Sequence, residues 1–267
     1  MLIQREDGML VVVRQTDHMA QVARIAEVWG NADFPAPEHR EETIRAAALH
    51  DNGWRDWEER PTLVPETGRP CNLAEVETAV HAAFYQVGVE RAVAIDPYTG
   101  LLVSMHATVL EAGVDGWNRQ TLMPPTRDDL SEVERSFIAE QAAVQRWLRE
   151  DLATSPRYGR SVAPARLWPA YLRLRAWDRL SLYFVYFGMG GGSLDHVPTA
   201  EGEATIALRQ IGPRSATADP WPFDRDAVTF PVVAVRVPDR RYDDGEEFLG
   251  VLAGTEPEVQ EFTMRSP

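Results

Sequence analysis

The segment Leu49-His50-Asp51-Asn52-Gly53-Trp54 stands where the helical pattern of residues 38–50 ends. A histidine followed directly by an aspartate at a helix end can give one metal ion two ligands, or bridge two ions. The pair could also be a solvated helix end, but the small residues Ala46-Ala47-Ala48 before it favour close packing and burial. Because a buried carboxylate without a partner is costly, we predict that the pair belongs to a buried metal site in a helical core.

Three further histidines are candidate ligands for the same site. His18 and His106 lie on the apolar faces of two predicted helices, and His81 lies beside the apolar stripe of a third. Each could instead be a core histidine satisfied by hydrogen bonds. Together with His50 they account for four of the six histidines in the chain, which favours a shared metal site. The predicted helices span about residues 17–29, 73–87 and 98–111.

Asp178 is the sixth candidate ligand. It shares one face of a helix predicted over residues 169–187 with apolar side chains. An ionised aspartate in such surroundings needs a positive partner or a metal ion. The alternative is a buried ion pair with an arginine, for example Arg175 or Arg179.

Composition and charge narrow the class of protein. A length of 267 residues with 44% hydrophobic content fits one large domain or a core with an appendage. The formal charge of −14 argues against a nucleic-acid partner. The single cysteine, Cys71, and the absence of a signal-like or membrane-length apolar segment predict a cytoplasmic protein without membrane association. All 27 positive charges are arginines, which excludes lysine-dependent catalysis.

The hydrophobic pattern predicts a mainly α fold with a small antiparallel sheet. Residues 1–13 are predicted to form a β-hairpin, and residues 14–187 a helical metal-binding core. Residues 188–267 are predicted to be a glycine-rich linker followed by strands that pack on the core as part of one domain. The strands are expected at about residues 205–209, 228–237, 248–253 and 259–264.

The order of these ligands resembles that of the HD-domain superfamily, whose members carry a histidine, a His-Asp pair and a distant aspartate on a helical bundle. The two additional histidines are similar to those of its dinuclear branch, which includes phosphodiesterases and diiron oxygenases similar to myo-inositol oxygenase. The His-Asp-Asn-Gly-Trp segment and the strand-rich end also look like an uncharacterised bacterial family of unknown function. The resemblance implies an HD-type bundle with two ions, one bound by His18, His50, Asp51 and Asp178, the other by Asp51, His81 and His106.

The function expected from these residues is metal-dependent hydrolysis of a phosphoester or related bond. Asp51 is the predicted catalytic residue, and Trp54, Arg55 and Tyr85 are predicted to contact a small anionic substrate. The ligand mixture suits two divalent ions, iron or manganese first and zinc second. Many HD hydrolases have a lysine close after the pair, where this chain has Arg55.

Two alternatives stay open at this point. One is a mixed-valent diiron oxygenase that cleaves a C–C or C–P bond, and the other is a non-catalytic HD-fold binding protein. A homodimer is compatible with either reading, and the pattern does not identify the substrate.

Overall fold

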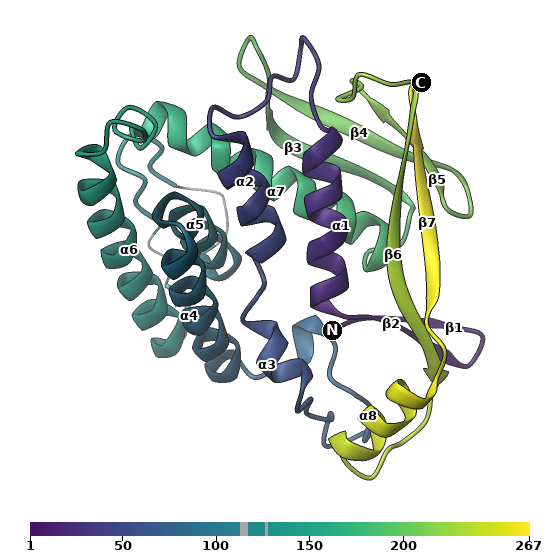
Figure 1. The fold of residues 1–267 in the computed structure, drawn as a ribbon. Coiled ribbons are helices and arrows are strands. Elements are labelled where there is room, and N and C mark those ends of the chain that lie inside the picture. Colours follow the sequence, from purple (N-terminus) through teal and green to yellow (C-terminus); the bar gives the residue numbers. More distant parts are fainter. Residues whose placement is uncertain (113–116, 126–127) are drawn as a thin grey trace.

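We describe the fold from a computed structural model of the chain, which describes residues 1–112, 117–125 and 128–267. The molecule has a layer of helices on one side and a long, curled sheet on the other (Figure 1). The sheet has seven strands in the order β1-β2-β6-β7-β5-β4-β3. The predicted mainly α HD-type bundle with a small sheet is therefore wrong, and the fold is mixed α/β.

The two ends of the chain build the sheet together. The N-terminal hairpin pairs with β6 through β2, and all neighbouring strands are antiparallel except β5 and β7, which are parallel. In β6, buried and more exposed side chains alternate, as expected for a strand with one face on the core. The strands are β1 (Leu2–Glu6), β2 (Met9–Val13), β3 (Gly191–Pro198), β4 (Glu203–Gly212), β5 (Ser215–Asp219), β6 (Ala227–Pro238) and β7 (Glu258–Arg265).

Helices α1 and α7 are placed between the sheet and helices α4, α5 and α6, whereas α8 lies at one end of the sheet (Figure 1). Helix α1 packs on β6 and on α7, and α7 packs on β3. In the described part of the chain, no helix is long and apolar enough to cross a membrane. The helices are α1 (Gln15–Val28), α2 (Arg40–Leu49), α3 (Trp54–Glu58), the 3-10 helix η1 (Leu73–Glu75), α4 (Thr78–Ile95), α5 (Pro97–Ala112), α6 (Glu132–Ala153), α7 (Pro164–Val185) and α8 (Gly245–Gly254).

Two segments differ from their predicted structure. Residues 248–253 were expected to be a strand, but they lie inside α8, whose first turn is capped by the Asp244 side chain accepting from Glu247 N at 2.8 Å. Its buried residues Phe248 and Leu252 are four apart, so helical spacing and the cap override the local β-propensity. The glycine-rich segment that was expected to be a linker from residue 188 is already part of edge strand β3 from Gly191 onward.

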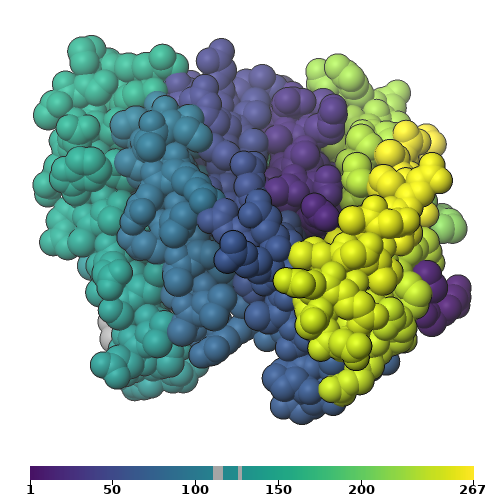
Figure 2. Space-filling model, turned by 60° about the horizontal axis from the view of Figure 1, so that its bottom comes forward, coloured from purple at the N-terminus to yellow at the C-terminus, as the bar shows by residue number. Residues whose placement is uncertain are grey.

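The C-terminal region packs against the loop between α3 and η1. Arg69 Nε and Asp239 Oδ1 are 2.6 Å apart, and Tyr242 N donates to Gly68 O at 2.9 Å. Figure 2 shows the yellow C-terminal atoms resting directly against blue atoms of the earlier chain. The strand region is thus held against the helices by ion pairing and backbone hydrogen bonds.

The turn that follows α2 is fitted closely to α4. A Cβ atom on Gly53 would stand 1.9 Å from the Phe84 carbonyl oxygen, so only glycine fits there. Asn52 Nδ2 donates to Leu49 O at 2.7 Å and to Gly88 O at 2.9 Å, which ties the turn to both helices. The Asn-Gly pair therefore fixes the position of His50 and Asp51 relative to α4.

Replacing Gly53 by alanine is expected to lower the free energy of unfolding by about 2 to 3 kcal/mol, because backbone must move to admit the methyl group. Gly250→Ala is the matched control, since Gly250 lies inside α8 with no atom within 4 Å of its Cβ position. That change should raise the free energy of unfolding by about 0.5 to 1 kcal/mol. Urea unfolding curves measure both, and equal effects at the two glycines would contradict the close fit.

Candidate metal centre

Five of the six predicted ligands converge in the interior. His18 comes from α1, His50 ends α2, Asp51 follows it, His106 comes from α5 and Asp178 from α7. Their ligand atoms form two overlapping groups, His18 with His50 and Asp51, and His50 with His106 and Asp178. Within each group the atoms lie within 4.8 Å of one another. All five residues are at most 5% exposed.

The Nε2 atom of His50 is at the centre of this arrangement. It lies 3.3 Å from His18 Nε2 and 3.5 Å from both Asp51 Oδ2 and Asp178 Oδ1. His18 Nε2 is 3.0 Å from Asp178 Oδ1, and His106 Nε2 is 3.7 Å from Asp51 Oδ1. Ring nitrogens and carboxylate oxygens thus lie close enough together to hold a metal ion.

The tautomer of His50 follows from its backbone contact. Its Nδ1 lies 2.8 Å from Ala47 O, a carbonyl that can only accept, so Nδ1 carries a proton. A neutral His50 ring consequently presents the lone pair of Nε2 to two carboxylates and to a second imidazole. Such an arrangement is repulsive unless a proton or a metal ion occupies the space between them.

The pKa values of these residues also indicate that positive charge is favoured at the site. Burial by itself would lower the pKa of His50, but the charge of Asp51 and the hydrogen bond and charge of Asp178 raise this pKa to about 9. Burial would raise the pKa of Asp51, yet the nearby His50 and His106 hold it below the usual range. The pKa of Asp178 is also lowered against the effect of burial, by hydrogen bonds from His18 and His50.

Tyr85 and Trp54 form a hydrogen-bonded chain that ends at Asp51. The Tyr85 hydroxyl donates to Asp51 Oδ1 at 2.6 Å, and Trp54 Nε1 donates to that hydroxyl at 3.2 Å. Burial and the Asp51 charge raise the pKa of Tyr85 well above 10, so the hydroxyl stays a donor. Both aromatic residues are buried and orient the carboxylate; a substrate contact for either stays a prediction.

His81 and Arg55 lie outside the cluster. The His81 ring packs against Trp54 and Tyr85, with centroids 5.5 and 4.6 Å apart, and belongs to neither group of ligands. Arg55 lies on the exposed side of α3. Among the described residues His81 is not grouped with Asp51 and His106, so its role as a ligand stays a prediction.

Sequence reasoning missed two residues that contact the centre. Ser181 lies beside His18, and Gln21 lies beside Ser181; all three are fully buried. Their spacing could have identified them. Each follows a candidate ligand by three residues and so lies on nearly the same helix face. Polar residues at this spacing in apolar helices indicate hydrogen bonds to the ligands.

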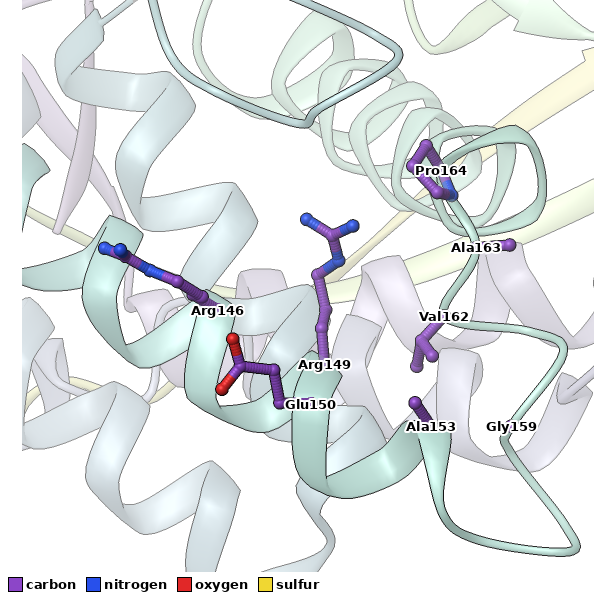
Figure 3. A pocket seen from close by; sticks show the side chains of 8 residues that line it. All are labelled: Arg146, Arg149, Glu150, Ala153, Gly159, Val162, Ala163 and Pro164. Atoms are coloured by element: carbon purple, nitrogen blue, oxygen red, sulfur yellow. The ribbon is translucent and has the colours of Figure 1, made fainter.

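The cavity shown in Figure 3 lies away from the centre, between the end of α6 and the start of α7. It has a volume of about 350 Å³ and is lined by none of the five ligands. The guanidinium groups of Arg146 and Arg149 point in different directions in Figure 3, so they do not converge on one anion. This cavity is not the entrance to the metal centre.

A family model described as a protein of unknown function, DUF3891, matches residues 1–239. The chain belongs to DUF3891. No curated protein and no solved structure matches the chain. The matched DUF3891 range contains all five clustered ligands, whereas the resemblance to the HD-domain superfamily stays a prediction that no comparison supports.

Removing the Tyr85 hydroxyl tests the support of Asp51. Tyr85→Phe is expected to lower the free energy of unfolding of the metal-free protein by about 2 kcal/mol, because the bond is made to a buried charge. Tyr242→Phe is the matched control, since that buried hydroxyl donates to the neutral carbonyl of Pro238 at 2.7 Å. The control should lose about 1 kcal/mol. Urea unfolding measures both, and a Tyr85 loss no larger than the control would contradict this role.

The stability of the metal-free protein should depend on pH through His50. Because its folded-state pKa of about 9 exceeds the ordinary 6.5, its contribution is complete below pH 6.5 and is lost as the pH rises through 9. The loss should be about 3 kcal/mol. Asp51 and Asp178 act oppositely, with stability present above pH 3.8 and lost as the pH falls. Chelator-treated protein unfolded in urea at a series of pH values measures this.

The control for this pH profile is His50→Gln, which should lack the loss between pH 6.5 and pH 9. A wild-type profile that is flat over the same interval would show that His50 is not held protonated by its two carboxylates.

Proposed function

We propose that this DUF3891 protein is a metal-dependent hydrolase that cleaves a phosphoester or related bond in a small anionic substrate. The observation that carries the proposal is the position of His50 Nε2, which faces two buried carboxylates and a second imidazole. A divalent cation satisfies all of these groups at once.

The ligand chemistry limits the choice of ion. Imidazole nitrogens with carboxylate oxygens suit iron, manganese or zinc, whereas calcium prefers oxygen ligands alone. The minimum form of the proposal is one ion held by the five clustered side chains. Its dinuclear form adds a second ion beside Asp51, with His81 recruited as a ligand, and metal content distinguishes the two forms.

The residues of the chain have separate tasks in such a reaction. The ion would lower the pKa of a bound water molecule and would neutralise charge on the phosphoryl group. Asp51 Oδ1 accepts from the Tyr85 hydroxyl, so Oδ2 is the oxygen left to hold the ion and would thereby position the attacking water. The surrounding burial keeps bulk water away and strengthens these electrostatic interactions.

Burial also favours a second candidate, a structural ion in a non-catalytic protein. The ligands are at most 5% exposed, and the cavities of 260 to 350 Å³ that we identify among the described residues are lined by other side chains. A hydrolase must open a path to the centre, whereas a structural ion needs none. The diiron oxygenase requires a second ion, so it depends on the dinuclear form of the site.

Metal content and hydrolysis of p-nitrophenyl phosphate esters test the proposal together. Purified protein should hold at least one ion per chain, and Asp51→Asn should lower both metal affinity and turnover by about 100-fold or more. Asp56→Asn is the matched control, because Asp56 is exposed and paired with Arg91 on the neighbouring surface. It should leave both quantities unchanged.

Each other outcome has a definite meaning. Metal far below one per chain, not restored by incubation with iron or manganese, would overturn the metal centre. A bound ion that raises the melting temperature without any turnover would favour the structural role. Turnover that requires dioxygen would replace hydrolysis by the oxygenase.

A further inference from the structure

We infer that Ser181 and Gln21 are positioning residues that fix the ring tautomer of His18 and so keep its Nε2 atom available to the metal ion. The use of Nε2 as a ligand depends on the proposed function. The tautomer itself depends only on a hydrogen-bonded chain in the core of the protein.

The chain runs from a backbone carbonyl of the sheet to the metal centre. Gln21 Nε2 donates to Phe230 O on β6 at 3.3 Å, and the Ser181 hydroxyl donates to Gln21 Oε1 at 2.6 Å. The next contact joins Ser181 Oγ to His18 Nδ1 at 2.8 Å. The side chains of Gln21, Ser181 and His18 are fully buried, so water does not compete for these bonds.

The direction of every bond in this chain can be assigned by elimination. The Phe230 carbonyl can only accept, so the amide nitrogen of Gln21 faces it and the amide oxygen faces Ser181. Ser181 has one hydroxyl proton, which it gives to Gln21. Its Oγ must then accept from His18, so His18 Nδ1 carries a proton.

With Nδ1 protonated, Nε2 is the ring nitrogen of His18 that is left for a metal ion, and it lies 3.0 Å from Asp178 Oδ1. His50 is fixed in the same tautomer by the Ala47 carbonyl. Both rings therefore direct Nε2 toward Asp178 Oδ1. The His50 ring is held by a backbone carbonyl, and the His18 ring by a relay of two side chains. Outer hydrogen bonds of this kind fix the orientation and basicity of metal-binding histidines.

The relay also joins three elements that are distant in the sequence. His18 and Gln21 lie on α1, Ser181 lies on α7, and Phe230 lies on β6. Neither Ser181 nor Gln21 has another apparent reason to be polar in an apolar interface. Their burial without the relay would leave unsatisfied groups at a cost of about 1 to 3 kcal/mol each.

Substitution of either relay residue should weaken metal binding. Gln21→Leu frees the Ser181 proton to be donated to His18 Nδ1, which permits the tautomer with hydrogen on Nε2. Ser181→Ala removes the acceptor for Nδ1. Each change should raise the Kd for Mn²⁺, measured by competition with a chelator, by about 10- to 100-fold.

Ser104→Ala is the matched control for both variants. Ser104 is fully buried, its hydroxyl donates to Gln141 Oε1 at 2.8 Å and accepts from Gln145 Nε2 at 3.1 Å, so these hydrogen bonds lie in the α5–α6 interface and go to none of the five ligands. The control should lose a similar hydrogen bond and stability while its Kd for Mn²⁺ stays that of the wild type. An equal loss of affinity in the control would reduce the relay to a structural role and overturn the inference.

The tautomer can be read directly by NMR of metal-free protein containing isotope-labelled histidine, with His18 assigned by comparison with His18→Gln. We expect His18 Nδ1 to be protonated in the wild type and to become partly unprotonated in Gln21→Leu. An unprotonated Nδ1 in the wild type would overturn the inference, whatever the metal content. A protonated Nδ1 in a protein that binds no metal would support the relay and overturn only the proposed function.

Discussion

The structure depends on how two buried carboxylates are neutralised. Asp51 and Asp178 are ionised although burial opposes it, because histidine rings from α1, α2 and α5 lie against them. In an interior of low dielectric constant, this balance can be kept only if a proton or a metal ion adds positive charge at the centre. Packing of four helices and neutralisation of the carboxylates are consequently linked, since the four helices bring the histidines against the carboxylates.

The segment from His50 to Trp54 shows how a short sequence meets that constraint. His50 and Asp51 supply ligand atoms, while Asn52 joins the turn to the carbonyls of Leu49 and Gly88. Gly53 leaves room for the backbone of α4, and Trp54 donates to the tyrosine that holds Asp51. No residue in the segment is free to change independently, because each fixes the position of a neighbour.

The sequence predicts the helices and most of the candidate ligands because the relevant signals are local. Apolar spacing places His18, His106 and Asp178 on buried faces, and the structure brings all three to the His-Asp pair. The position of His81 was not predictable in this way. One turn of α4 separates His81, which packs on Trp54, from Tyr85, whose hydroxyl donates to Asp51. The fold class was wrong because strand pairing is decided by distant partners: Gly191 and Ser215 begin strands only through their neighbours in the sheet.

The seven-stranded sheet, which is larger than the sequence predicted, has a part in the centre. Its strand β6 receives the hydrogen bond of Gln21 through Phe230, and α1 and α7 are held against it. A helical bundle alone would supply the ligands but not this carbonyl, which determines the direction of the relay to His18. The ligand set can therefore resemble that of the HD-domain superfamily while the surrounding architecture differs. The chemistry of a site depends on which side chains converge there and not on the fold that positions them.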